Sequence, residues 1–483
     1  MKFKIVARIL GLLLIFLAVA MLLPIPFSLY YGDSDYIALL ISSGISLSVG
    51  IIPLLIRKNE KEKKELRAKE GFAVVTLAWI VFSAFGALPF VIDGAIPSYT
   101  DAFFETMSGF SATGATILTD VEAMPHGLMF WRSLTHWLGG MGIIVLSLAI
   151  LPFLGVGGMQ LFKAEVPGPV VDKLSPRITE TAKILWSVYV LFTAGETILL
   201  MLGDMSFFDA LCHSFGTMAT GGFSTKNASI GSYGSAYIDY VIFIFMVIAG
   251  TNFSLHYRML KGSFRAVWKS EEFRFYISII IGATLLIGID VYARNYTNIF
   301  ETLQYTLFQV AAIITTTGYG TADYETWSSS SQAILFLLMF VGGCAGSTGG
   351  GMKVLRFYLL FKFVYSEIVK LIHPQAIVPV RIGGTVVDRK VMTNIAGFFV
   401  LFMIITGFGI IIMSYMGLDF PSAAGAVAAT INNIGPGLGQ VGPTDNYAFI
   451  PTGGKWLLSF FMLVGRLEVF TVIILLAPSF WRK

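Results

Sequence analysis

The chain has 483 residues, of which 55% are hydrophobic and only 13% are charged. Its mean hydropathy is +0.76. This composition excludes a soluble globular protein and indicates a chain that lies almost wholly within a membrane, with lipid as its surroundings. The formal net charge of +4 says little by itself, and no nucleic-acid partner is expected.

The positions of the basic residues predict the topology. Lys and Arg gather on the cytoplasmic side of membrane proteins. Of the 33 Lys and Arg residues, 28 lie in six segments: 1–8, 57–69, 163–183, 258–274, 353–390 and 482–483. If all six segments are cytoplasmic, the chain crosses the membrane an even number of times between successive segments. Both termini are then cytoplasmic.

The first 70 residues form the first predicted unit. Two apolar stretches, 5–31 and 36–56, are each long enough to span a bilayer. The first is too long for the apolar region of a cleaved signal peptide, so we expect a retained helix. The charged run at 57–65 is predicted to be a solvated cytoplasmic loop.

Each later unit repeats one order: a spanning helix, a half-helix, a glycine segment and a second spanning helix. We place the four units at 71–176, 177–272, 273–386 and 387–483. The first spanning helices are predicted at 71–92, 177–202, 273–292 and 391–416, and the half-helices at 99–110, 207–218, 298–314 and 420–431. The second spanning helices are predicted at 127–153, 237–260, 332–365 and 456–480. With the first two, this makes ten spans.

The four glycine segments resemble one another and lie at 112–116, 219–223, 316–320 and 433–437. Their central glycines are taken as Gly114, Gly221, Gly318 and Gly435. Repeats that run in the same direction are related by a rotation about the membrane normal. The predicted fold is therefore an all-α membrane protein, with two N-terminal helices and four parallel repeats around a central pore.

The chemistry of these segments favours a cation. Non-helical backbone at membrane depth is tolerated where it is buried or lines a water-filled path, and rings of carbonyls can replace the water around a potassium ion. Half-helix C-termini aimed at the axis would add negative partial charge. For any single segment, close helix packing through glycine is the alternative. The candidate carbonyl ligands belong to Ala112, Thr113, Gly114, Ala219, Thr220, Gly221, Thr316, Thr317, Gly318, Asn433, Ile434 and Gly435.

Residues 342–351 are dominated by glycine and interrupt the second helix of the third repeat. Because each glycine costs about 1 kcal/mol in a helix relative to alanine, we expect a break that leaves a loop on the cytoplasmic side of the glycine segments. The alternative is a close helix crossing through small residues.

Arg466 lies within the last predicted span, where a charge is costly and faces a cavity or a partner. A guanidinium below the glycine segments would repel cations. The alternative is a buried ion pair with Glu468 or Glu196.

Several polar residues are expected to support the glycine segments. Glu105, His213 and Gln309 lie in the half-helices and are predicted to form hydrogen bonds behind the segments, while Arg132 is predicted to brace the first one. Cys212 and Cys344 lie far apart in sequence and are predicted to be small buried residues.

A different class of function is also considered, namely a membrane-embedded enzyme such as a lipid or glycosyl transferase. The chain has five His residues, and it contains no His-Glu-x-x-His, Gly-x-Ser-x-Gly or Walker pattern. The sequence therefore predicts no catalytic residue and no covalently bound cofactor.

The chain resembles the Trk/Ktr/HKT superfamily of potassium transporters, and its two additional N-terminal helices are similar to the TrkH branch. The resemblance rests on four motifs at 110–116 (FSATGAT), 131–142 (WRSLTHWLGGMG), 342–353 (GGCAGSTGGGMK) and 465–468 (GRLE). It implies potassium uptake across a bacterial cytoplasmic membrane. In that superfamily a serine at the first filter glycine accompanies sodium permeation, so four glycines favour potassium.

The resemblance further implies a movable gate, which comprises Gly343, Cys344, Ala345, Gly346, Ser347, Thr348, Gly349, Gly350 and Arg466. It also implies a homodimer on a cytoplasmic ring of RCK/KTN-type regulatory subunits that bind NAD or adenine nucleotides. Passive conduction is the expected mode. A potassium symporter driven by H⁺ or Na⁺ with alternating access is the alternative.

Overall fold

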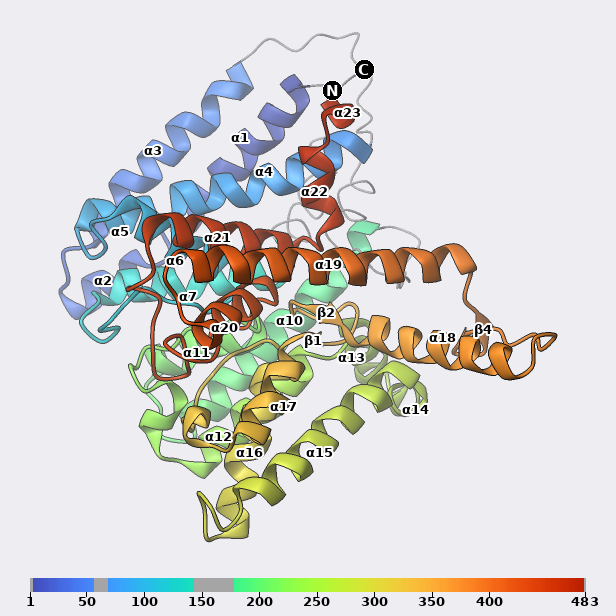
Figure 1. Ribbon diagram of the computed structural model, residues 1–483. Helices are drawn as coiled ribbons and strands as arrows, with labels where there is room; N and C mark the ends of the chain where they lie inside the picture. The colour runs from blue at the N-terminus through green and yellow to red at the C-terminus, as the bar shows by residue number, and fades with distance from the viewer. Residues whose placement is uncertain (1–2, 56–67, 143–177, 482–483) are drawn as a thin grey trace.

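The computed structural model describes residues 3–55, 68–142 and 178–481 (Figure 1). Nearly all of its regular structure is helical. Six helices in the described residues are long and apolar enough to cross a membrane, or seven if one bent pair is included. The predicted loop at 57–65 lies outside these residues.

The N-terminal unit contains α1 (Phe3–Ala20), α2 (Ile25–Tyr31) and α3 (Tyr36–Leu55). Helices α1 and α3 approach most closely at two glycines. A Cβ atom on Gly50 would lie 2.8 Å from the Gly11 carbonyl oxygen, and one on Gly11 would lie 2.5 Å from the Gly50 oxygen. Small residues that allow such close approach are typical of helix pairs in membranes.

The first helix of each later unit is long, and Figure 1 shows α15 at the outer edge of the molecule. In the first unit, a short turn divides it in two. These helices are α4 (Ala68–Gly86) with α5 (Leu88–Asp93), α10 (Ile178–Met201), α15 (Glu271–Val291) and α19 (Arg389–Tyr415). All four occur where the sequence predicts them.

The half-helices lie in the interior and are largely buried. They are α6 (Tyr99–Phe110), α11 (Phe207–Met218), α16 (Ile299–Ile314) and α20 (Phe420–Ile431), each within one residue of its predicted bounds. Ser98, Ser206 and Asn298 cap the first three by accepting hydrogen bonds from backbone N–H groups. The fourth has a proline in its first turn instead, at Pro421.

The second helices comprise α7 (His126–Gly140), α12 (Ala236–Ala249) with α13 (Phe253–Leu260), α17 (Ser329–Met339) with α18 (Val354–Ile372), and α21 (Thr452–Arg466) with α22 (Phe470–Leu476) and α23 (Pro478–Trp481). Those of the second, third and fourth units are broken. The predicted break in the third unit is confirmed. The remainder of the helix predicted at 127–153 lies outside the described residues.

The predictions of continuous helices at 237–260 and 456–480 were wrong. Helices α12 and α13 meet at 104°, because Asn252 leaves the helical path and caps α13 through its side chain. Between α21 and α22, Glu468 and Val469 have φ values of 50° and 22°, which an α-helix cannot contain. These breaks leave fewer continuous spans than the ten that were predicted.

The remaining elements are short. They are α14 (Phe264–Lys269), the 3₁₀ turns η2 (Ser229–Tyr233) and η3 (Tyr324–Thr326), the parallel pair β1 (Val341–Gly342) and β2 (Met352–Lys353), and the hairpin of β3 (Arg381–Ile382) and β4 (Thr385–Val386). The pair β1–β2 closes the base of the glycine-rich loop.

The two ends of the chain lie on the same side of the molecule. The ring of Phe3 stacks on that of Trp481, with 6.4 Å between the ring centroids. Lys69, at the start of α4, donates a hydrogen bond to the Phe480 carbonyl oxygen at 3.3 Å. That both termini are cytoplasmic stays a prediction.

Replacing Gly50 by valine is expected to separate α1 from α3, because the new side chain would meet the Gly11 carbonyl and the side chains of Leu14 and Ile15. Overpacking of this kind costs about 1–3 kcal/mol. Thermal unfolding in detergent should therefore show a lower midpoint for Gly50→Val. The matched control is Gly44→Val on the same helix, where nothing lies within 4 Å of an added Cβ. Equal midpoints for the two variants would contradict the packing account.

Candidate functional site

All four half-helices end in the same hydrogen-bonded turn. The third residue beyond each helix donates its N–H to a carbonyl five positions earlier: Thr113 to Ser108, Gly221 to Gly216, Thr317 to Ala312 and Ile434 to Ala429, at 2.8–2.9 Å. This is the Schellman arrangement, in which the preceding residue adopts the left-handed conformation. The chain therefore leaves each half-helix in the same direction.

The left-handed residue of each turn is not glycine. Ala112, Thr220, Thr316 and Asn433 have φ values of 52°, 55°, 60° and 54°. Such a conformation costs a residue with a Cβ atom roughly 1–2 kcal/mol, so the surrounding structure must hold each turn in place. The repetition of this strain in four segments makes them a candidate functional site.

The turns also correct the predicted alignment of the second segment. The glycines with positive φ, each four residues past its helix, are Gly114, Gly222, Gly318 and Gly435. Gly221 is thus equivalent to Thr113, and Ala219 is the helix cap. The triplet predicted at 219–221 should be 220–222. The prediction matched Thr220-Gly221 to Thr113-Gly114 by residue type, but the helix end at Met218 determines the register.

The four segments form a closed ring. In each, the glycine lies so close to the neighbouring segment that an added Cβ would collide with a backbone carbonyl oxygen. The pairs are Gly114 with the Gly221 oxygen, Gly222 with that of Thr317, Gly318 with that of Ile434, and Gly435 with that of Thr113. Each segment thus contacts the next in chain order, and the fourth returns to the first. We call the four glycines with positive φ the glycine ring.

A cavity of about 140 Å³ opens at the glycine ring, and all four of its glycines line it. Loops from the first, second and fourth units complete the walls, with Thr116, Asn227 and Asp445 among the polar residues. The ring therefore surrounds one shared opening rather than four separate sites.

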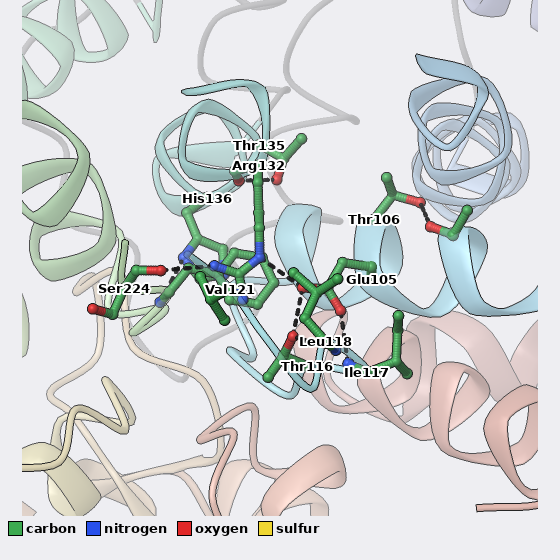
Figure 2. Close-up of polar contacts among 12 residues, drawn as sticks. Glu105, Thr106, Thr116, Ile117, Leu118, Val121, Arg132, Thr135, His136 and Ser224 are labelled. Atoms are coloured by element: carbon green, nitrogen blue, oxygen red, sulfur yellow. Dashed lines mark hydrogen bonds and ion pairs between the residues drawn. The ribbon is translucent and has the colours of Figure 1, made fainter. Parts of the chain in front are cut away.

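A buried ion pair supports the first two segments (Figure 2). The Arg132 Nε atom donates to Glu105 Oε1 at 2.7 Å, and both side chains are nearly inaccessible. The two Glu105 oxygens also accept hydrogen bonds from the Thr116 hydroxyl and the Ile117 N–H, both at 2.9 Å. Arg132 reaches the second segment through the Ser224 carbonyl oxygen, at 3.0 Å. One ion pair thus connects the backbone that follows Gly114 to the backbone that follows Gly222.

Glu105, His213 and Gln309 occupy the same position, nine residues before the ring glycine of their own segment. His213 Nε2 lies 3.0 Å from the Ser224 hydroxyl, and Gln309 donates to the Ala322 carbonyl oxygen at 3.3 Å. The predicted hydrogen bonds behind the segments are confirmed. Counted from Gly221, the central glycine that the sequence predicted, His213 would lie only eight residues away.

The fourth segment is supported differently, because Ala426 stands at this position and cannot form a side-chain hydrogen bond. The Tyr447 hydroxyl donates to the Gly435 carbonyl oxygen and that of Tyr324 to the Gly437 oxygen, both at 2.7 Å. Sequence reasoning missed both tyrosines. Tyr324 lies in η3 and Tyr447 in a loop, and the two have no repeated spacing. The Asn433 amide also donates to the Thr113 hydroxyl at 2.9 Å, so the fourth segment is bound to the first.

The glycine-rich loop contacts the ends of three half-helices. Its Gly350 N–H donates to the Thr316 hydroxyl at 2.7 Å. Its Thr348 hydroxyl donates to the Met218 carbonyl oxygen at 3.0 Å. A Cβ on Gly350 would come within 2.7 Å of the Asn432 oxygen. The second half of the loop therefore packs directly against the turns that carry the glycine ring.

The first half of the loop is attached to the bend between α12 and α13. Cys344 donates its N–H to the Gly250 carbonyl oxygen at 2.8 Å, and Phe253 donates to the Gly346 oxygen at 3.0 Å. The Ala345 N–H donates to Glu272 at 2.6 Å. Cys344 is buried, as is Cys212, which confirms the prediction for both cysteines.

Arg466 is the last residue of α21 and connects the glycine-rich loop to α7. Its guanidinium donates to the Thr348 carbonyl oxygen at 2.7 Å and to those of Gly139 and Gly140 at 2.5 and 2.9 Å. Positive charge at the C-terminus of α7 is favourable. Glu468, one of the partners considered for Arg466, accepts a hydrogen bond from Arg356. That pair joins α18 to the break after α21.

Comparisons with known proteins agree with this geometry. The TrkH family, described as a cation transport protein family, matches residues 41–483. The chain is 42% identical to the Trk system potassium uptake protein TrkH of Salmonella typhimurium strain LT2, over the full length of both. It is 34% identical to TrkG of Escherichia coli K12, over 99% of each chain.

The crystal structure of the potassium transporter TrkH from Vibrio parahaemolyticus superposes on this fold with a TM-score of 0.90. The two sequences are 38% identical, and the match covers 100% of each chain. The chain therefore belongs to the TrkH family of cation transport proteins.

Proposed function

We propose that this protein takes up potassium across the cytoplasmic membrane of a bacterium by passive conduction through the glycine ring. The observation that carries the proposal is the closed cycle of close contacts between glycines and carbonyl oxygens in four successive segments. Relatives of similar length are named potassium uptake proteins. The ion is the substrate, and the carbonyl oxygens of residues 112–114, 220–222, 316–318 and 433–435 supply its ligands.

A cation passing the ring exchanges water for carbonyl oxygen. Backbone carbonyls are suited to this exchange because their dipoles are already oriented and lose little freedom when an ion arrives. The four half-helices end at the ring, so their C-terminal partial charges lower the energy of a cation there. The Glu105–Arg132 pair holds two of the segments in place, which limits how far the ring can contract around a smaller ion.

The glycine-rich loop and Arg466 act as the gate. Residues 343–350 lie against the half-helix ends through Thr348 and Gly350, and Arg466 holds the loop by the Thr348 carbonyl. The guanidinium adds positive charge next to the path, which opposes a potassium ion. Movement of the loop away from Thr316, together with Arg466, opens the path.

The proposal also covers the orientation of the protein in the membrane and its partners. Both termini and the basic segments 258–274 and 353–390 face the cytoplasm. The protein forms a homodimer on a ring of nucleotide-binding regulatory subunits. The hairpin β3–β4, between α18 and α19, extends to one side of the molecule (Figure 1). Arg381 of the hairpin, with Arg389 and Lys390 at the start of α19, faces that ring.

The conduction mode is tested with the purified protein in liposomes that contain potassium and take up labelled rubidium. Uptake should proceed down the cation gradient without a proton or sodium gradient, because a continuous ring needs no coupled ion. Empty liposomes and liposomes with heat-denatured protein serve as controls. Uptake that requires an inward proton or sodium gradient would instead establish the symport alternative.

Gly222→Ala is expected to reduce rubidium uptake about tenfold or more, because Gly222 has a φ of 77° and faces a backbone oxygen that cannot move aside. Backbone strain of about 1.4 kcal/mol is enough to lower uptake tenfold. A Cβ on Gly221 meets the His136 ring, a side chain, at 2.5 Å.

Gly221→Ala should therefore lower uptake through its contact with His136, and adding His136→Ala should restore it. Adding His136→Ala to Gly222→Ala should not restore uptake. His136→Ala alone is the control, and gel filtration reports folded protein. If His136→Ala restored uptake to the Gly222 variant but not to the Gly221 variant, the alignment predicted from sequence, with Gly221 equivalent to Gly114, would be correct instead.

Arg466→Gln should increase uptake, on the order of tenfold if the charge contributes about 1.4 kcal/mol to the barrier. Glutamine keeps hydrogen-bond donors for the Thr348 and Gly139 carbonyls but removes the charge. Arg466→Lys keeps the charge and should retain low uptake. If both variants lower the yield of folded protein and neither raises uptake, Arg466 is a structural connection and not an electrostatic barrier.

A further inference from the structure

A groove of about 340 Å³ lies between α10 and α13, away from the glycine ring. Its walls are mainly apolar. Helix α10 contributes Ile184, Val188 and Leu191, while α13 contributes Tyr257 and Leu260. Leu191 and Leu260 are each more than half exposed, so an apolar partner could cover them.

Two lysines border this groove. Lys183 lies in the second turn of α10, and Lys261 is the residue that caps the end of α13. Both are exposed, and the Lys261 ammonium lies 4.7 Å from the centre of the Tyr257 ring. Among the described residues that line the groove, none is acidic. The groove thus has a positive end and an apolar wall.

The position of the groove matches the depth of a lipid headgroup. Helix α10 is a candidate membrane span, and Lys183 lies in its second turn, close to the end where a span meets the headgroup region. Basic pockets between transmembrane helices bind the headgroups of anionic lipids. A small soluble anion would use the lysines but would leave Leu191 and Leu260 uncovered.

We propose that this groove binds one acidic phospholipid from the surrounding leaflet. Its phosphate lies between the Lys183 and Lys261 ammonium groups. Its acyl chain packs along Ile184, Leu191 and Leu260. The inference concerns lipid binding and does not depend on how the protein conducts ions.

The bound lipid would contact the helix that holds the glycine-rich loop. Helix α13 begins at Phe253, which donates its N–H to the Gly346 carbonyl oxygen at 3.0 Å. The His256 ring is bonded to the Ile248 carbonyl at 2.8 Å, so the bend between α12 and α13 is fixed on both sides. A lipid that restrains α13 therefore acts one helix away from the loop.

The test is binding of dioleoyl phosphatidylglycerol to the purified full-length protein, measured by native mass spectrometry against dioleoyl phosphatidylcholine. The wild type should retain phosphatidylglycerol in preference. K183Q/K261Q should bind it more weakly by about fivefold for each lysine. R265Q/K269Q removes two positive charges from neighbouring α14 outside the groove and should bind as the wild type does.

A second variant tests the apolar wall without changing charge. Ser187 is exposed and lines the groove, so S187W should fill the groove and abolish phosphatidylglycerol retention while the protein still folds. The proposal is overturned if the wild type does not distinguish the two lipids, or if K183Q/K261Q and S187W both retain phosphatidylglycerol. Displacement of the lipid by millimolar inorganic phosphate would also overturn it, because the site would then be one for a soluble anion.

Discussion

The architecture depends on the contact between a carbonyl oxygen and a residue without a Cβ atom, made between neighbouring segments in a closed cycle. At Gly114, Gly222 and Gly318, any side chain would occupy the position of the neighbouring oxygen. The same residues adopt positive φ, which glycine accepts at no steric cost. Distance and conformation therefore require glycine independently, and replacement would disturb both the backbone and the ring.

The strained turns before these glycines explain why so much polar structure surrounds the ring. Backbone groups that leave a helix inside a membrane must find partners within the protein. The Glu105–Arg132 pair, Gln309 and two tyrosine hydroxyls provide them. The glycine-rich loop satisfies its own backbone in the same way, through Gly250, Thr316 and Arg466. Loop and ring consequently share hydrogen bonds.

Sequence alone predicted the spans and the half-helices because apolar length and capping residues are local properties. It also located the break at 342–351, where glycine is concentrated. It did not predict the bends at Asn252 and Glu468, because those positions depend on contacts with other units, such as the Arg356–Glu468 pair. The register of the second segment was misread because two adjacent glycines, Gly221 and Gly222, are equivalent in composition and differ only in the turn that precedes them.

The four quarters of the ring come from a single polypeptide, and they are not chemically alike. Ala112, Thr220, Thr316 and Asn433 occupy equivalent positions in the four segments, and each is encoded by its own codon. In a tetramer of identical subunits, a substitution alters every quarter at once. Here one segment of the ring can be changed while the other three remain native, so the ring can be altered one quarter at a time, by evolution as well as by mutagenesis.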